Sequence, residues 1–284
     1  MSSVKRFFSL AGLLAFFVIS IGTPLNVFAG HSWGGYHWFW DSGKFTGAQL
    51  PLTVNDNTTP SSAWRNGGIL DDVISIWNQG CPSINPACLP SISTPLVLGK
   101  QYGKNTSNER KCPPTLGQID VCNTTYGRNG WLGIASVWVS GKHITQGTVK
   151  LNDTYFNTST YNKPAWRNLV LCQELGHTLG LDHQDTIFTN ANLNTCMDYT
   201  NLPDSNQWAN YHDFEELKII YNHIDATSGT SSTASSPGKA PPEMANDMNE
   251  RSQWGKQLRA GGTQVYLLDI GDGHKIYTFV LRAE

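Results

Sequence analysis

The chain has 284 residues, of which 39% are hydrophobic and 15% charged, and its formal net charge is −2. Its 20 basic and 22 acidic side chains form no basic patch along the sequence, which argues against a nucleic-acid partner. The length suits one sizeable domain with a tail, and we expect a monomer.

The N-terminus has the pattern of a secretory signal. Lys5 and Arg6 precede an apolar run from Phe7 to Ile21, and the segment 27–29 resembles a cleavage site. We therefore expect residues 1–29 to be removed, which leaves 18 basic and 22 acidic side chains. A membrane anchor is the alternative, but the run is short for a bilayer span. No other long apolar run follows, so the mature protein is expected to be secreted, without a membrane span.

The mature chain opens with aromatic residues from Trp33 to Trp40. They indicate either a sugar-binding strip or a buried N-terminal strand, and we favour burial. Leu50, Leu52 and Val54 alternate with other residues, which predicts a strand. A series at helical spacing then predicts a helix ending near Asn78: Ile69, Leu70, Val73, Ile76 and Trp77.

The middle of the chain changes in composition. The stretch 81–130 is rich in Pro, Ser, Asn and Gly and is interpreted as loops. From 131 to 153 β-branched residues return, punctuated by Gly141 and Gly147, which predicts two or three strands.

A helix is predicted next. Pro164 suits its first position, where the missing N–H has no cost. Small and apolar residues follow at alternating spacings of four and three: Ala165, Leu169, Cys172, Gly176 and Leu179. Gly180 can end this helix in a left-handed conformation. Further along, Asp213 and Glu216 resemble a capping box that opens a last helix.

The composition shifts again after Asp225. Residues 226–260 form a linker rich in Ser, Thr, Pro and Gly, followed by a polar segment. Residues 261–284 predict a β-hairpin with its turn at 271–273. A lone hairpin is marginally stable, so we expect it to dock on the main domain, on a partner or on a surface. The main domain is predicted to span 30–225.

One stretch of the predicted helix carries the chemistry of a metal site. Residues four apart share a helix face, so Gln173 and His177 face the same point in space. Glu174 lies one step aside, within reach of a water at that point. Gly180 lets the chain turn and return His183 to it. This is the geometry of a three-ligand zinc site with an open fourth position.

The pattern resembles the His-Glu-x-x-His-x-x-Gly-x-x-His motif of the metzincin clan of zinc metallopeptidases, with Gln173 in place of the first histidine. The segment 194–199 is similar to the Met-turn of that clan. Met197 matches the methionine beneath the metal, and Tyr199 matches a tyrosine that binds zinc or steadies the transition state. The segment 147–152 resembles the edge strand along which these enzymes align substrate.

The resemblance implies an α+β, zincin-like metallopeptidase fold: a twisted mixed sheet with an active-site helix, and a smaller C-terminal subdomain that contains the Met-turn. It implies a secreted, zinc-dependent metalloendopeptidase that hydrolyses peptide or protein substrates with a metal-activated water. The implied roles are general base for Glu174, catalysis for Tyr199, zinc ligation for Gln173, His177 and His183, and structural support for Met197, Gly180, Cys172 and Cys196.

Gln173 departs from the motif, because a carboxamide is a weaker zinc ligand than an imidazole. It can ligate weakly in a slower peptidase, or another group such as Tyr199, a water or a distant histidine can replace it. The third alternative is a non-catalytic, extracellular protein-binding module on the same fold. Asp182 is a rival to His183 as terminal ligand. The other histidines lack ligand spacing and are interpreted as non-metal residues: His31, His37, His143, His212, His223 and His274.

Six cysteines in an exported chain predict disulfides. Sequence alone leaves many pairings open, and we favour nearest neighbours: Cys81–Cys88, Cys112–Cys122 and Cys172–Cys196. The last pair would tie the predicted metal helix to the segment below the metal. Zinc thiolate sites are the competing interpretation, but no paired C-x-x-C occurs.

Overall fold

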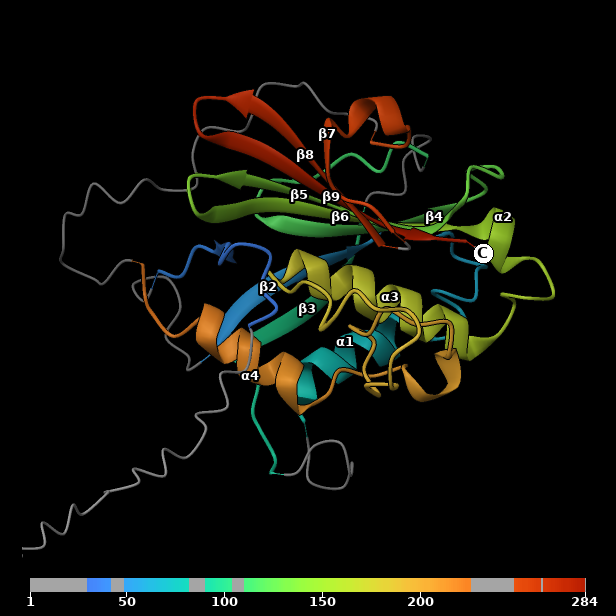
Figure 1. Ribbon diagram of the computed structural model, residues 1–284, viewed down its shortest axis with the longest axis horizontal. Helices are drawn as coiled ribbons and strands as arrows, with labels where there is room; N and C mark the ends of the chain where they lie inside the picture. Colours follow the sequence, from blue (N-terminus) through green and yellow to red (C-terminus); the bar gives the residue numbers. More distant parts are fainter. Residues whose placement is uncertain are drawn as a thin grey trace, which may run out of the picture.

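The computed structural model describes residues 30–41, 49–81, 90–103, 110–225, 248–261 and 263–283. The predicted signal peptide, Cys88 and most of the predicted linker lie outside the described residues. The described chain is an α+β structure built on one mixed sheet, as expected from the sequence (Figure 1). No helix within these ranges is long and apolar enough to cross a membrane.

The sheet has nine strands in its described part. In spatial order they are β3 (Leu96–Tyr102), β2 (Leu50–Asp56), β4 (Gln118–Thr124), β6 (His143–Asn152), β5 (Trp131–Ser140), β9 (His274–Arg282), β8 (Thr263–Gly271) and β7 (Lys256–Arg259), while the short β1 (His37–Trp38) pairs with β6. Pairs from β3 to β6 are parallel, and every pair from β6–β5 onward is antiparallel.

Helices cover one face of this sheet. These are α1 (Ile69–Gln79), α3 (Pro164–Thr178) and α4 (Tyr211–Ile220), which lie on the same side in Figure 1, whereas the short α2 (Asp153–Phe156) follows β6. Pro164 occupies the first turn of α3, and Gly180 has φ 106° just beyond its end, both as predicted. The start of α4 differs from the prediction, because Asn210 rather than Asp213 is its N-cap and Asp213 closes the capping box.

Two predictions about the middle of the chain need correction. The stretch 81–130 is not all loop, because it contains β3 and β4. In β3 only Leu96 and Leu98 are buried apolar residues, and in β4 the buried Ile119 and Val121 alternate with the buried polar Asp120, so the polar composition around the apolar residues masked the pattern. The segment 147–152 is not an edge strand, because β6 pairs with β4 on one side and with β5 on the other.

The C-terminal hairpin is β8 and β9, and it docks on the main domain. β9 pairs with β5 from Trp131↔Arg282 to Ser140↔His274, so the hairpin extends the central sheet. The segment 226–260 also holds β7 and a 3₁₀ turn at Arg251–Gln253 within its described part. The β5–β9 pairing lies beyond the reach of local sequence patterns, because it joins residues more than 130 positions apart.

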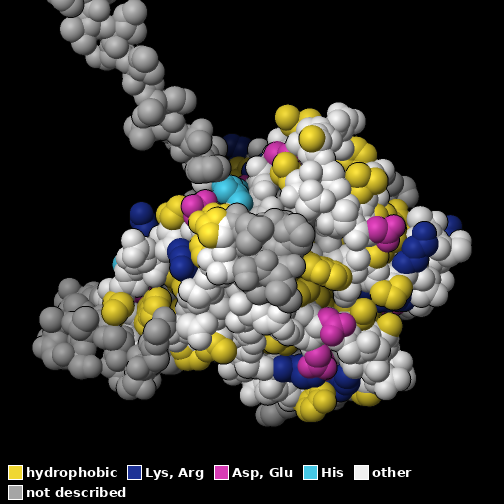
Figure 2. Space-filling model, turned by 90° about the horizontal axis from the view of Figure 1, so that it is seen from below, with side chains coloured by type: hydrophobic (Ala, Val, Ile, Leu, Met, Phe, Trp, Pro, Cys, Tyr) yellow, Lys and Arg dark blue, Asp and Glu magenta, His cyan; other side chains and the backbone are white. Residues whose placement is uncertain are grey.

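β5 is buried on both faces. Ala135 and Val137 belong to the main core between the sheet and the helices. Ile134 and Trp138 alternate with them and join a second core, which Met248, Trp254 and Tyr266 complete on the opposite face. On the face shown in Figure 2, basic and acidic side chains are scattered among apolar ones.

The disulfides Cys112–Cys122 and Cys172–Cys196 are formed as predicted. The predicted burial of the N-terminal segment is confirmed too, since Trp33 and Trp38 are buried. Both indoles donate to carbonyls at the end of α3, Trp33 to His177 at 2.9 Å and Trp38 to Thr178 at 2.9 Å. The N-terminal segment therefore satisfies helix carbonyls that have no partner within the helix.

Candidate metal centre

The helix α3 places Gln173, Glu174 and His177 in the interior, where each is at most 1% exposed. The helix contacts β5, β6 and α1, so it is enclosed on several sides. Hydrogen bonds from Trp33, Trp38 and Tyr221 to its last carbonyls fix its C-terminal turn. The predicted site residues therefore stand on a rigid support.

The amide of Gln173 has a defined orientation. Its Nε2 donates to the carbonyl of Cys196 at 2.8 Å and to that of Asp198 at 3.0 Å. Its Oε1 is buried and has no hydrogen-bond partner among the described residues. Because a buried polar atom normally has a partner, this oxygen is a candidate ligand atom.

The imidazole of His177 also has a defined orientation. Its Nδ1 lies 2.8 Å from the carbonyl of Leu181, so this nitrogen carries the proton and Nε2 keeps a free lone pair. Nε2 is buried and makes no hydrogen bond within the described part of the chain. Burial, followed by the neighbouring His183, holds the pKa of His177 well below its ordinary value. The ring is therefore neutral, the form that binds metals.

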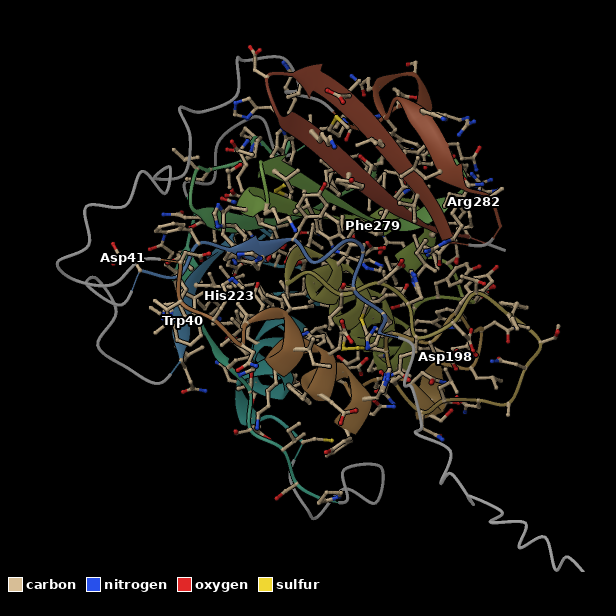
Figure 3. The ribbon with its side chains drawn as sticks, turned by 60° about the vertical axis from the view of Figure 1, so that its left-hand side comes forward. Trp40, Asp41, Asp198, His223, Phe279 and Arg282 are labelled. Carbon is tan, nitrogen blue, oxygen red and sulfur yellow. A yellow bond between two sulfur atoms is a disulfide. The ribbon has the colours of Figure 1, made fainter. Side chains whose placement is uncertain are left out.

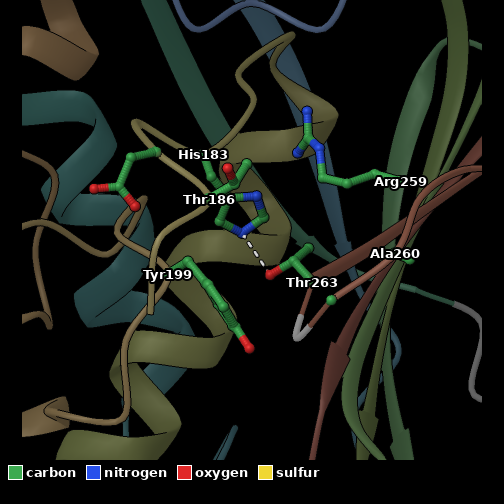
Figure 4. A pocket seen from close by; sticks show the side chains of 8 residues that line it. His183, Thr186, Tyr199, Arg259, Ala260 and Thr263 are labelled. Carbon is green, nitrogen blue, oxygen red and sulfur yellow. Dashed lines mark hydrogen bonds between the residues drawn. The ribbon is translucent and has the colours of Figure 1, made fainter. Parts of the chain in front are cut away.

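Gly180 lets the chain turn back after α3, and this brings His183 beside His177. The two ring centroids are 4.6 Å apart. Nε2 of His183 faces the hydroxyl of Thr263 at 3.2 Å (Figure 4). A Cβ at position 180 would come within 2.6 Å of the carbonyl of Tyr36, so this turn requires glycine for space as well as for φ.

The rival ligand Asp182 has another partner. Arg259 donates to both of its carboxylate oxygens, with its Nη1 at 2.7 Å from Oδ1 and its Nη2 at 2.5 Å from Oδ2. Burial alone would raise the pKa of Asp182, but hydrogen bonds from Arg259 and His183 outweigh it and hold the pKa far below its ordinary value. This bidentate pair leaves His183 as the better candidate ligand.

Glu174 lies against the backbone of β5. A Cβ on Gly133 would come within 2.7 Å of Oε1 of Glu174, so only glycine leaves room for the carboxylate. Neither oxygen of this carboxylate makes a hydrogen bond of ordinary geometry in the described ranges. Burial raises the pKa of Glu174 well above its ordinary value, against the opposing effect of nearby amides of Ala135 and Leu281.

Met197 and the Cys172–Cys196 disulfide pack against the part of α3 that carries Gln173 and His177. A Cβ on Gly176 would come within 2.5 Å of the Met197 sulfur, so helix and methionine are in close contact. The Cys172–Cys196 disulfide joins the same two segments, because Cys172 precedes Gln173 and Cys196 is the residue whose carbonyl accepts from the Gln173 amide. Helix and loop thus form one unit beneath the candidate ligands.

Tyr199 lines two neighbouring pockets. The first contains His183, Thr186, Arg259 and Thr263 (Figure 4). The second is more apolar and includes Leu132, Tyr161, Trp166, Phe188 and Leu281. The structure therefore places Tyr199 in one pocket with His183, whereas Gln173, Glu174 and His177 line neither pocket.

The C-terminal strands cover this region, which the sequence did not predict. Phe279 of β9 stacks on His177 with ring centroids 4.2 Å apart and lies between the sheet and α3 (Figure 3). Thr263 of β8 contacts His183, and Arg259 of β7 binds Asp182. One sequence signal was available, because the apolar residues of the hairpin fall on both of its faces and thus indicate burial.

The chemistry of the donor atoms is of a kind that zinc accepts. Gln173 Oε1 and His177 Nε2 are buried atoms with lone pairs and no partner in the described chain, and the ring of His183 lies beside that of His177. Nitrogen and oxygen ligands of this kind suit Zn²⁺. No protein-family model, curated protein or solved structure matches the chain.

Proposed function

We propose that this protein is a secreted zinc metalloendopeptidase related to the metzincin clan. The observation that carries the proposal is the pair of buried lone-pair atoms, Gln173 Oε1 and His177 Nε2, on one turn of α3. The close contact of Met197 with Gly176 supports a Met-turn beneath a metal. Zn²⁺ is the proposed cofactor, with Gln173, His177 and His183 as its ligands.

When bound, zinc would polarise the scissile carbonyl and make a water more acidic. Glu174 is the proposed general base. In this role it takes a proton from the water and returns it to the leaving amine. The hydroxyl of Tyr199 is proposed to donate a hydrogen bond to the negative charge that develops on the oxygen of the scissile carbonyl. His177 must stay neutral for ligation, and its burial together with the neighbouring His183 lowers its pKa enough to outweigh the opposing effect of the Leu181 carbonyl.

The conformation described is proposed to be a closed form. An extended peptide beside Glu174 would pair with the edge of β5, because Gly133 of β5 is the backbone next to that carboxylate. β9 already occupies this edge and is antiparallel to β5. Phe279 fills the space above His177. Substrate binding therefore requires β9 to move, and the closed form is latent.

A non-catalytic binding module on the same fold is the alternative. The covering of His177 by Phe279 favours it, because the site has no open ligand position on that side in this conformation. Gln173 in place of histidine favours it as well. This alternative predicts neither zinc binding at Gln173, His177 and His183 nor cleavage of any peptide library.

The deciding experiment measures zinc content and cleavage of a peptide library by the mature chain and by Arg259→Ala/Thr263→Ala. That double substitution removes the contacts of β7 and β8 with Asp182 and His183. We expect cleavage to rise at least tenfold in this variant and to vanish when Glu174→Ala is added. Lys256→Ala, an exposed change on β7, is the matched control. Cleavage that survives Glu174→Ala would exclude the proposed mechanism.

Gln173→His tests the unusual ligand separately. An imidazole at this position should raise zinc affinity by at least the roughly 10–100-fold that an outer-shell partner of a metal ligand contributes. Absence of zinc binding both before and after this substitution would favour the binding module.

A further inference from the structure

We propose a second metal site, formed by His37, His223 and Asp225, that binds a divalent transition metal of the zinc type. These residues come from the N-terminal segment and from the chain after α4. Figure 3 shows His223 beside Trp40, on the side of the molecule away from Asp198 and Arg282. The site is therefore separate from the candidate metal centre on α3.

Three ligand atoms converge here. Nε2 of His37 lies 2.9 Å from Nε2 of His223 and 3.2 Å from Oδ1 of Asp225. Nε2 of His223 lies 3.3 Å from the same Oδ1. In a tetrahedral zinc site with bonds of about 2.0–2.1 Å, neighbouring ligand atoms lie roughly 3.3 Å apart. An ion just outside the plane of the three atoms would thus contact all of them at ordinary bond lengths.

The surroundings orient each ligand as a metal site requires. Nδ1 of His37 lies 3.0 Å from the carbonyl of Gly35, which directs the Nε2 lone pair toward the cluster. Oδ2 of Asp225 accepts from the amide of Trp40 at 2.7 Å. Nε2 of His143 lies 3.0 Å from the same Oδ1 of Asp225 and helps to hold the carboxylate in place. These outer contacts fix the carboxylate and one imidazole before any ion binds.

The chemistry of the contacts also indicates a cation. Two imidazole Nε2 atoms face one another and share a single carboxylate oxygen. If Nδ1 of His37 donates to Gly35, its Nε2 presents a lone pair to the negative Asp225, which is repulsive unless a proton or a metal ion lies between them. The His223 side chain is 42% exposed, whereas those of His37 and Asp225 are at most 10% exposed. An ion can therefore enter from solvent and bind to a preformed, mostly buried pair.

The ion would join the N-terminal segment to the end of α4. The backbone already pairs there, because the amide of Asp225 donates to the carbonyl of Trp40 at 2.9 Å. Two nitrogen ligands and one carboxylate leave a position for water, which suits zinc. The role is structural, because a metal here stabilises the end of the N-terminal segment whose indoles fix the C-terminal turn of α3.

The test compares the mature wild-type chain with His223→Asn, which removes the most exposed ligand and has the least effect on folding. Zinc per chain is measured by mass spectrometry after equilibration in buffered zinc, and the melting temperature is followed against zinc concentration. We expect His223→Asn to bind one zinc fewer than wild type. At a free zinc concentration a hundredfold above Kd, this site should raise the melting temperature by about 5–10 °C. Asn222→Ala, an exposed neighbour, should change neither quantity.

The two metal proposals fail independently. If wild type binds one zinc and His223→Asn binds none, the site at His37, His223 and Asp225 stands and the peptidase proposal loses its metal. If His223→Asn binds as much zinc as wild type and has the same zinc-dependent melting temperature, the second site is excluded. A cluster held together by a proton would give this last result.

Discussion

The ring of Phe279 lies on the imidazole of His177 with the two planes only 12° apart. The chain thus places a residue from its C-terminal strand against a residue of the predicted zinc motif. The same strand pairs along β5 beside Glu174. The zinc motif on α3 and the strand β9 that covers it therefore form one packed unit.

Phe279→Ala should destabilise the fold strongly. The ring is fully buried in the main core and contacts both His177 and Trp33. Loss of a buried phenylalanine leaves a cavity, and we expect a loss of about 3–5 kcal/mol of unfolding free energy. Urea denaturation measures it. Phe188→Ala, at a partly exposed ring, is the control and should lose much less. Equal losses would show that β9 is not packed on α3 in solution.

Glu174→Gln should stabilise the closed form at neutral pH. Burial raises the pKa of Glu174 in the folded state. Above its unfolded pKa, near 4.5, the unfolded chain releases this proton while the folded chain still holds it, and this lowers the free energy of unfolding. The cost grows by up to about 1.4 kcal/mol per pH unit until the folded pKa is reached. Without metal, the advantage of the variant should be absent at pH 4 and increase toward pH 8. Urea unfolding across this range, in EDTA, measures it, and a pH-independent difference would contradict it.

Arg259→Ala should leave the carboxylate of Asp182 buried without its bidentate partner. Removing one member of such a pair costs about 3–5 kcal/mol when it is deeply buried, and we expect the lower end because Arg259 is partly exposed. The folded pKa of Asp182 is depressed, so the pair stabilises the fold above the unfolded pKa near 3.8, and this stability is lost as the pH falls below it. The difference in unfolding free energy between wild type and Arg259→Ala should therefore shrink as the pH falls below 3.8. Lys256→Ala serves as control.

Gly176→Ala tests the contact with Met197. The added Cβ would meet the methionine sulfur at 2.5 Å and a ring carbon of Trp77 at 3.0 Å. Overpacking of this kind costs about 1–3 kcal/mol, more than the roughly 1 kcal/mol that alanine gains over glycine in a helix. In a Met197→Ala background the same change should cost clearly less, because only the tight contact with Trp77 remains. A double-mutant cycle by thermal unfolding measures this coupling, and additive effects would show that the two residues are not in contact.

Local patterns were enough for much of the fold. Alternation at Leu50, Leu52 and Val54 predicted β2, and the apolar series from Ile69 predicted α1, since burial of one face requires these periods. β3 and β4 were missed because their short apolar alternations lie within polar, proline-rich sequence. The edge-strand assignment of segment 147–152 was wrong because strand order is set by pairing between distant segments.

The histidines also divide into those that local sequence brings together and those that only tertiary packing brings together. Spacing along one helix and its turn was enough to predict that Gln173 and His177 share a helix face and that His183 returns beside His177, because helix geometry is local. His37 and His223 are 186 residues apart, and only the packing of the N-terminal segment on α4 brings their nitrogens together. No periodicity in the sequence carries that information.

The sequence by itself determined the helix that carries the predicted zinc motif and the turn at Gly180, and a preference for nearest-neighbour cysteines predicted the two disulfides that the structure describes. Each depends on a few neighbouring residues or on short separations. Tertiary structure alone decided that β9 lies along β5 and that Phe279 covers His177. The physical reason is that a strand edge pairs through its backbone, which every sequence offers equally, so only the complete packing of both cores selects the partner.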